Sequence, residues 1–176
     1  MSYRVIVLNG TSSSGKSSIA RALQARLAEP WLTLSVDDLI AAMPEWMLQR
    51  VAGIAFELDG RIVVGEEFAR LDRAWGAGVA AMVRAGVPVI IDEVLLSGGA
   101  GQERWRAVLA GIDTLWAGVH CDAAVLAGRE RARGDRTVGM AADQAPLVHA
   151  GVSYDLEVDT TDMSPEQCAE RIVARL

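Results

Sequence analysis

Apolar runs alternate along the chain with segments of helical spacing. Four runs predict strands over residues 3–8, 31–36, 87–91 and 114–119, and a weaker run predicts a fifth at 156–158. Residues 87–91 read Val-Pro-Val-Ile-Ile and hold no polar side chain. A strand without polar positions is typical of a parallel sheet that is covered on both faces.

The segments between these runs predict helices. Ile19, Leu23 and Leu27 share one helical face over residues 17–27. Further helices are expected over residues 66–85, 102–109, 123–133 and 165–176, with one more beginning near residue 39. Ser164 is the expected N-cap of the last helix, ahead of Pro165. This alternation predicts an α/β fold of three layers, a five-stranded, mainly parallel sheet with helices on both faces.

Residues 53–65 interrupt the alternation. They predict a β-hairpin with Asp59-Gly60 as its turn. Two interpretations remain open: a substrate-binding insertion over about residues 38–65, or a surface excursion without a role in the site. No linker divides the sequence, so residues 1–176 are expected to form a single domain.

A phosphate-binding loop is the clearest motif. Residues 10–17 read Gly-Thr-Ser-Ser-Ser-Gly-Lys-Ser and match G-x-x-x-x-G-K-[ST] between a predicted strand and a predicted helix. The loop N–H groups and the helix N-terminus together form an anion site. Lys16 is expected to reach the β- and γ-phosphates, and the Ser17 hydroxyl to ligate Mg²⁺. The residues expected to bind ATP are Gly10, Thr11, Ser12, Ser13, Ser14, Gly15, Lys16, Ser17 and Ser18, together with Arg129 and Arg133.

Acidic residues follow two of the predicted strands. Ligands of open parallel sheets bind at the carboxyl ends of the strands, so these carboxylates are expected near the phosphates. Asp37 is the candidate base for an acceptor hydroxyl, and Asp38 is the better candidate for a helix cap. Asp92 ends an apolar strand, which is the Walker B pattern, and is expected to hold Mg²⁺ with Ser17. The alternative is a solvated strand end, and a contribution of Glu93 to the metal site is left open.

Residues 129–136 carry four arginines. Arginine side chains match the oxygens of a transferring phosphoryl group. The pattern predicts a lid over about residues 129–140, with Arg133 and Arg136 as its catalytic cations. A solvated helix end that favours positive charge is the alternative.

The composition excludes several classes of partner. A formal net charge of −6 opposes binding to nucleic acid, and no apolar stretch reaches the length of a membrane span. The N-terminal residues lack the pattern of a signal peptide, so a cytoplasmic protein with access to ATP and Mg²⁺ is expected. The two cysteines have no metal-site spacing. A homo-oligomer is neither predicted nor excluded.

The ordered motifs resemble those of the chloramphenicol phosphotransferases, small kinases that phosphorylate a hydroxyl of the antibiotic. The resemblance extends over nearly the whole chain. It is carried by residues 8–17 (L-N-G-T-S-S-S-G-K-S), 29–32 (E-P-W-L), 36–44 (V-D-D-L-I-A-A-M-P), 102–106 (Q-E-R-W-R), 128–136 (G-R-E-R-A-R-G-D-R), 148–155 (V-H-A-G-V-S-Y-D) and 157–161 (E-V-D-T-T).

This resemblance implies a P-loop fold akin to the adenylate and shikimate kinases, with ATP and Mg²⁺ as cofactors. It implies that Asp37 is the base, that Lys16 and Ser17 bind at the phosphates, and that Arg133 and Arg136 belong to the lid. The chain departs from the family pattern at Glu93, where the family has a second aspartate, and over residues 45–64, where the similarity fades.

The function expected from these observations is transfer of the γ-phosphate of ATP to a hydroxyl of a small molecule. The expected acceptor is chloramphenicol or a similar antibiotic, which the transfer would inactivate. The alternatives are a kinase of a different hydroxylated metabolite and an ATP-binding regulatory switch.

Overall fold

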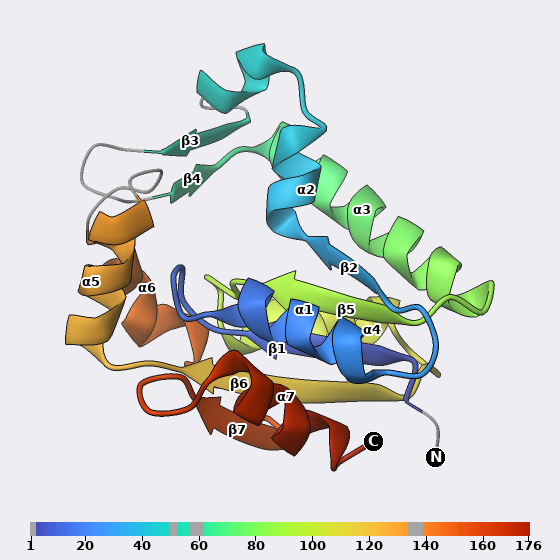
Figure 1. The fold of residues 1–176 in the computed structure, drawn as a ribbon. Helices are drawn as coiled ribbons and strands as arrows, with labels where there is room; N and C mark the ends of the chain where they lie inside the picture. Colours follow the sequence, from blue (N-terminus) through green and yellow to red (C-terminus); the bar gives the residue numbers. More distant parts are fainter. Residues whose placement is uncertain (1–2, 50–52, 57–61, 134–138) are drawn as a thin grey trace.

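The computed structural model describes residues 3–49, 53–56, 62–133 and 139–176, and its centre is one five-stranded sheet (Figure 1). The strand order is β2-β5-β1-β6-β7, and every pairing is parallel. The predicted α/β fold is therefore confirmed. The strands are β1 (Val5–Asn9), β2 (Leu32–Ser35), β5 (Val89–Glu93), β6 (Thr114–His120) and β7 (Leu156–Asp159).

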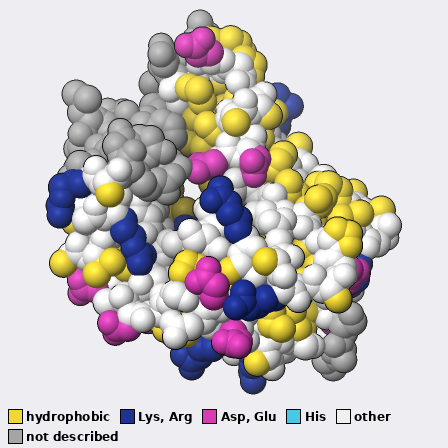
Figure 2. Space-filling model, in the orientation of Figure 1, with side chains coloured by type: hydrophobic (Ala, Val, Ile, Leu, Met, Phe, Trp, Pro, Cys, Tyr) yellow, Lys and Arg dark blue, Asp and Glu magenta, His cyan; other side chains and the backbone are white. Residues whose placement is uncertain are grey.

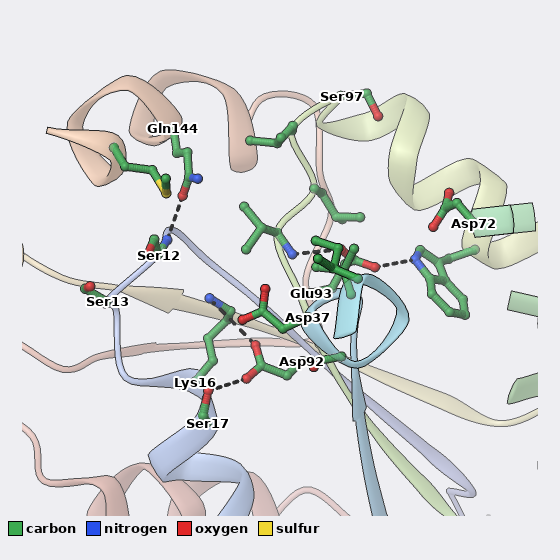
Figure 3. A pocket seen from close by; sticks show the side chains of 18 of the residues that line it. Ser12, Ser13, Lys16, Ser17, Asp37, Asp72, Asp92, Glu93, Ser97 and Gln144 are labelled. Atoms are coloured by element: carbon green, nitrogen blue, oxygen red, sulfur yellow. Dashed lines mark hydrogen bonds and ion pairs between the residues drawn. The ribbon is translucent and has the colours of Figure 1, made fainter. Parts of the chain in front are cut away.

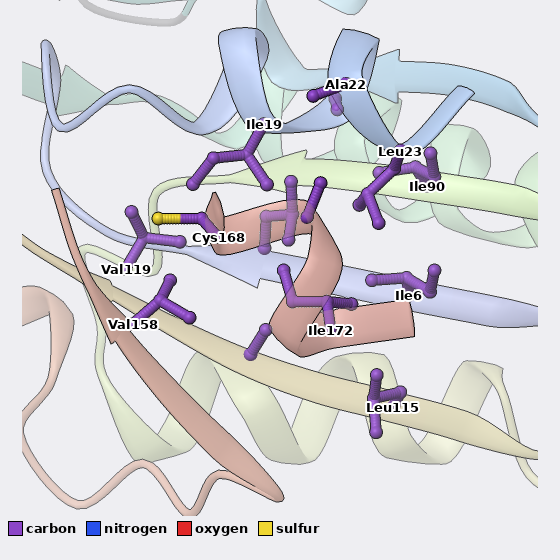
Figure 4. Packing of buried hydrophobic residues seen from close by; sticks show 14 of the residues in the cluster. Ile6, Ile19, Ala22, Leu23, Ile90, Leu115, Val119, Val158, Cys168 and Ile172 are labelled. Carbon is purple, nitrogen blue, oxygen red and sulfur yellow. The ribbon is translucent and has the colours of Figure 1, made fainter. Parts of the chain in front are cut away.

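Helices cover both faces of this sheet. Ile6 and Leu8 of β1 pack toward α1 (Lys16–Arg26) and α7 (Pro165–Val173), in a core that includes Ile172 (Figure 4). The alternate residues, Val5 and Val7, belong to the core beneath α3 (Glu66–Arg84) and α4 (Gly99–Val108). Both sides of β1 are buried, which explains why its sequence shows no polar alternation.

Smaller elements stand beyond the carboxyl ends of the strands. On one side lie α2 (Val36–Ala41), a 3₁₀-helix η1 (Glu45–Gln49) and an antiparallel pair, β3 (Ile54–Phe56) and β4 (Ile62–Val64). Leu39, Met43, Met47, Ile54 and Phe68 form their own apolar core. On the other side lie α5 (Ala123–Arg133) and α6 (Met140–Val148) (Figure 1). The strands of the expected hairpin are confirmed, whereas its turn at residues 59–60 lies outside the described residues.

Two helices differ from the sequence prediction. The helix expected near residue 39 begins at Val36, because the Ser35 hydroxyl accepts the Asp38 N–H and caps it there. Helix α6 was not predicted at all. Its N-cap, Gly139, makes no side-chain cap, and Pro146 lies inside the helix, so neither a start signal nor an uninterrupted pattern marks it in the sequence.

The last helix agrees with its predicted start. Ser164 and Gln167 form a capping box at the N-terminus of α7, with Pro165 in the first turn. The longest helix, α3, has 19 residues and mixes charged with apolar side chains. Among the helices in the described part of the chain, none combines the length and apolar character that crossing a bilayer requires.

Candidate active site

A cavity of about 1020 Å³ opens at the carboxyl ends of the strands. Its walls come from the loop between β1 and α1, from α2 and α3, from the segment after β5, and from α5 and α6 (Figure 3). Acidic and basic side chains surround a hollow in this face of the molecule (Figure 2). The volume lies at the upper end of the usual range for ligand pockets, which leaves room for nucleotide phosphates and a second small molecule.

The phosphate loop has the backbone conformation that its glycines predict. Gly15 has φ 95°, and Ser13 has φ 60°, which is uncommon for a residue with a Cβ. A Cβ on Gly10 would lie 2.4 Å from the Val119 carbonyl oxygen, so this position requires glycine. The Ser13 hydroxyl is buried and has no hydrogen-bond partner among the described residues. An unsatisfied buried hydroxyl in an anion-binding loop fits a site that is completed by phosphate oxygens.

The predicted phosphate-binding residues divide into two sets. Ser12, Ser13, Gly15, Lys16, Ser17 and Ser18 line the cavity. Gly10, Thr11 and Ser14 are not among the lining residues. The Ser14 hydroxyl instead donates to the Thr11 carbonyl at 2.9 Å, which braces the loop from behind.

Lys16 is a buried lysine held at the centre of the site. Its side chain is 6% exposed, and Nζ donates to the Thr11 carbonyl at 2.7 Å. Nζ also lies 3.7 Å from Asp92 Oδ1. A buried ammonium needs such partners, and both are placed where anionic oxygens of a bound phosphate could join them.

Ser17 and Asp92 meet as the sequence predicts. The Ser17 hydroxyl donates to Asp92 Oδ2 at 2.6 Å (Figure 3). The described residues contain no cluster of three or more metal-ligating side chains. A hydroxyl and one carboxylate nevertheless fit Mg²⁺, because this ion keeps several waters and takes its other ligands from substrate phosphates.

Asp37 lies in the first turn of α2 and lines the cavity, where Figure 3 shows its carboxylate pointing inward. Its neighbour Asp38 has a different task. Asp38 Oδ2 accepts the Ser35 N–H at 2.7 Å and completes the capping box of α2. The capping role expected for Asp38 is therefore confirmed, and Asp37 lies on the cavity wall.

Glu93 faces a different part of the cavity from Asp92. Its Oε1 accepts the Val94 N–H at 2.9 Å, and its Oε2 accepts the Trp105 Nε1–H at 3.0 Å. Burial raises the pKa of Glu93 to about 7, although both hydrogen bonds act in the opposite direction. Burial also raises the pKa of nearby Asp72, against the effect of Arg104. The contacts of Glu93 place it with the wall formed by Trp105, away from Ser17, which the sequence did not reveal.

The wall around Glu93 is largely apolar. Side chains from α2, β3, β4, α3, the segment after β5 and α4 contribute to it. They are Val36, Ile40, Ile54, Val64, Phe68, Val94, Leu95, Leu96 and Trp105. An apolar wall with a few convergent polar groups is typical of a site for a small organic molecule. We call this part the acceptor half, and the part around residues 10–18 the phosphate half.

Arg129 joins α5 to the phosphate half. Its guanidinium donates to the Thr160 hydroxyl at 3.0 Å and to the Thr160 carbonyl at 2.8 Å. The Thr160 hydroxyl in turn donates to the Ser14 carbonyl at 2.7 Å. Arg129, Thr160 and Met163 all line the cavity beside the loop. The segment after β7 is thus part of the site, although no role was expected for Thr160 or Met163 from the sequence.

The other two predicted lid arginines cannot be placed in the cavity. Arg133 is the last residue of α5, and its side chain is outside the description. Arg136 lies within residues 134–138, which the structure does not describe. The lid, and the roles of Arg133 and Arg136 in it, stay predictions.

Sequence reasoning also missed Gln144, on α6. This side chain is 5% exposed and lines the cavity (Figure 3). Its Oε1 accepts the Ser12 N–H of the phosphate loop at 2.7 Å. Because α6 itself was not predicted, nothing in the sequence placed Gln144 beside the loop.

A polar cluster lies where β1 ends and the phosphate loop begins. Asn9, at the end of β1, donates to the Tyr154 hydroxyl at 2.6 Å and accepts the Leu95 N–H at 3.0 Å. The Tyr154 hydroxyl is also 2.7 Å from His149 Nδ1. Burial lowers the pKa of His149 to about 4, with the stacked His120 ring acting in the same direction. Through these contacts His149 and His120 belong to the polar cluster next to the end of β1.

Comparison with known proteins gives a family. The model of the chloramphenicol phosphotransferase-like proteins matches residues 3–176. Two proteins of Mycobacterium tuberculosis, from strains CDC 1551 / Oshkosh and H37Rv, are each named as a provisional O-phosphotransferase. Each is 32% identical over 181 residues, which covers 96% of this chain and 80% of the relative.

Solved structures share the fold at low sequence identity. A sugar kinase from Janibacter sp. HTCC2649 has a TM-score of 0.71 and 21% identity, and covers 98% of this chain and 94% of its own. The M. tuberculosis APS kinase, solved with AMPPNP and APS, has a TM-score of 0.64 and 16% identity, with 98% and 96% covered. Shikimate kinase from Acinetobacter baumannii, solved with shikimate, has a TM-score of 0.61 and 13% identity, with 99% and 93% covered.

Proposed function

The chain belongs to the chloramphenicol phosphotransferase-like family, and from this premise we propose that it transfers the γ-phosphate of ATP to a hydroxyl of chloramphenicol or a similar small molecule. Membership of this family, and the relatives, support a P-loop phosphotransferase of small molecules without specifying the acceptor. The acceptor, the metal and the residue roles are part of the proposal.

One observation supports the proposal most strongly. The Ser17 hydroxyl, the Asp92 carboxylate and the Lys16 ammonium converge at 2.6 Å and 3.7 Å, and all three lie on the wall of one cavity. P-loop enzymes need this set of groups to hold a triphosphate and its metal. In the proposed complex, Lys16 and the loop N–H groups bind the β- and γ-phosphates, while Ser17 and Asp92 hold Mg²⁺. The bound Mg²⁺ supplies positive charge to the phosphate oxygens.

Asp37 is the proposed base. It accepts the proton of the acceptor hydroxyl as that oxygen attacks the γ-phosphorus and the bond to the β-phosphate oxygen breaks. Its place in the first turn of α2, next to a rigid capping box, fixes the side chain at the boundary of the two halves. Arg133 and Arg136 are proposed to add positive charge when the lid covers the nucleotide.

The acceptor half favours a molecule with an apolar body and a few polar groups. Its wall is largely apolar, and its polar groups include Asp72, Arg73, Glu93, Ser97 and Arg104. Chloramphenicol fits this description, as does a metabolite with an apolar body and hydroxyl groups. A regulatory switch would not need such a second compartment beside the nucleotide.

The direct experiment is to incubate the protein with Mg²⁺, ATP and chloramphenicol and to analyse the products by mass spectrometry. We expect a product heavier than chloramphenicol by one phosphoryl group, formed in proportion to ADP. Lys16→Ala serves as the control that should form neither. A panel of other hydroxylated compounds tests the alternative acceptors. ADP release that is the same with and without every compound would contradict the proposal.

A further inference from the structure

Gln144 is a buried glutamine whose amide is satisfied at one end. Its Oε1 accepts the Ser12 N–H at 2.7 Å, and its side chain is 5% exposed. A backbone N–H can only donate, so the amide oxygen must face Ser12 and the NH₂ group must face elsewhere. Within the described part of the chain, this NH₂ group has no hydrogen-bond partner. Gln144 lines the cavity, so this NH₂ group is a donor that a ligand in the cavity can use.

The position of this donor follows from one peptide unit of the loop. Lys16 Nζ donates to the Thr11 carbonyl at 2.7 Å, and Gln144 accepts from the N–H of the same peptide, that of Ser12. In a trans peptide the C=O and N–H point in opposite directions. Lys16 and Gln144 therefore lie on opposite sides of the Thr11–Ser12 peptide, roughly 7 Å apart by standard bond lengths. Lysine in this motif reaches the β- and γ-phosphates, so Gln144 lies within roughly 7 Å of the ammonium that would contact the end of the triphosphate.

Helix α6 is fixed at both ends, which holds Gln144 in place. At its start, the carboxylate of Glu130, which is 1% exposed, accepts the Gly139 N–H at 3.0 Å and the Ala141 N–H at 2.7 Å. At its end, Asn9 donates to the Val148 carbonyl at 2.7 Å. The amide of Gln144 is thus preorganised from a rigid element, and binding a phosphate need not order it first.

We propose that Gln144 binds the terminal phosphoryl group of ATP, with its oxygen on the Ser12 N–H and its NH₂ group donating to a γ-phosphate oxygen. This inference rests on the proposed function, because it takes the loop as a nucleotide site. Gln144 neither gains nor loses a proton: the bond from the γ-phosphorus to the β-phosphate oxygen breaks, and the bond to the acceptor oxygen forms. The residue thereby distinguishes a triphosphate from a diphosphate in the loop.

Gln102 provides a matched control. It is also a buried glutamine, 1% exposed, and lies on α4 outside the cavity wall. Both ends of its amide are used by one residue: Nε2 donates to the Ser153 carbonyl at 2.7 Å, and Oε1 accepts the Ser153 N–H at 2.9 Å. A change at Gln102 tests the general effect of altering a buried amide, without a free donor at the cavity.

The experiment measures the dissociation constants of ADP and AMPPNP, each with Mg²⁺, by calorimetry. Gln144→Ala should weaken AMPPNP binding about tenfold while ADP binding changes by less than about twofold. Gln144→Glu keeps an oxygen for Ser12 but places a carboxylate beside the phosphate, so the AMPPNP loss should be larger. Gln102→Glu should leave the ratio of the two constants unchanged. Gln144→Met, which removes both polar ends at similar length, replaces Gln144→Glu if that variant does not fold.

The outcomes separate this inference from the proposed function. Equal losses for ADP and AMPPNP, or no loss for either, in the Gln144 variants would overturn the inference, since the residue would then only brace the loop. A wild-type protein that binds neither nucleotide would overturn both the inference and the proposed function.

Discussion

The two halves of the cavity are built in different ways. The phosphate half comes mainly from consecutive residues, 10–18, together with Asp92 of β5, which lies 2.6 Å from Ser17. The acceptor half gathers side chains from α2, β3, β4, α3, the segment after β5 and α4, and most of them are apolar. One half is thus specified locally by backbone conformation and charge, and the other by the packing of distant elements. The chemistry of transfer can be conserved while the acceptor changes.

Asp37 stands between the halves, and its loss should have the largest effect. Asp37→Asn removes the proton acceptor but keeps the shape, so the turnover should fall about a thousandfold while the affinity for ATP stays unchanged. Steady-state rates and calorimetry give the two values. Asp38→Asn is the neighbouring control, because Asp38 caps α2 and should affect stability more than rate. If Asp37→Asn is as active as the wild type, Asp37 is not the base.

Lys16→Ala tests the phosphate half alone. Removing the ammonium should lower the transfer rate about a hundredfold, because it stabilises charge that develops on the phosphoryl oxygens. Nucleotide affinity should fall as well, whereas binding of the acceptor in the absence of nucleotide should not change. Calorimetry with chloramphenicol measures that last quantity. A variant that loses acceptor binding together with ATP binding would show that the halves are not separable.

Binding of Mg²⁺ should depend on residues of the phosphate half and not on those of the acceptor half. Asp92→Asn should raise the Mg²⁺ concentration for half-maximal activity about tenfold, and chelation with EDTA should stop transfer. Glu93→Gln, one residue further on, should leave this concentration unchanged, since Glu93 is bonded to Val94 and Trp105. Activity that persists in EDTA, or the same shift in both variants, would contradict the separation of Asp92 from Glu93.

The last predictions concern the dependence of stability on pH, where Glu93 in the acceptor half and His149 near the phosphate loop should act in opposite directions. The folded-state pKa of Glu93 is raised to about 7, so the folded protein holds this proton more tightly than the unfolded chain. The stability from Glu93 is full below about pH 4.5 and is lost as the pH rises through about 7, on the order of 3 kcal/mol. The pKa of His149, beneath the phosphate loop, is lowered to about 4, so its effect on stability increases as the pH rises from about 4 to 6.5.

Urea titrations of the metal-free and nucleotide-free protein between pH 4 and 7.5 measure both slopes. Glu93→Gln should gain stability relative to wild type as the pH rises toward 7. His149→Gln should lose stability relative to wild type as the pH rises from about 4 to 6.5. Parallel curves for the wild type and Glu93→Gln would mean that the carboxyl of Glu93 titrates normally.

The sequence predicted the fold and the phosphate half because their signals are local. The all-apolar run of β5 requires burial on both faces, and the loop glycines, Lys16 and Ser17 are fixed by the conformation of one turn. Asp92 could be paired with Ser17 in advance because neighbouring parallel strands end at the same edge. These features need no knowledge of distant packing.

The polar contacts of the acceptor half and the helix α6 could not be predicted, because their signals are not local, and for residues 38–65 the sequence left a substrate-binding insertion as one of two interpretations. Glu93 lies on the acceptor side only because Trp105, twelve positions later, donates to it. Gln144 is a single amide in a mostly apolar segment. Pro146 lies inside the helix that carries it, and a proline argues against a helix in the sequence. Glu130 lies in the arginine-rich motif at residues 128–136, but nothing in that motif shows that its carboxylate accepts N–H groups at the start of α6. In each case the partner is distant in sequence and leaves no periodic pattern.

The central claim is that the loop at residues 10–17 holds the triphosphate of ATP with its metal at Ser17 and Asp92. A crystal structure of the protein with Mg²⁺ and AMPPNP tests it most directly. We expect the β- and γ-phosphate oxygens within hydrogen-bond distance of Lys16 Nζ and the loop N–H groups, with Mg²⁺ ligated by Ser17. Phosphates bound elsewhere, or a loop that stays closed on its own groups at saturating nucleotide, would contradict it.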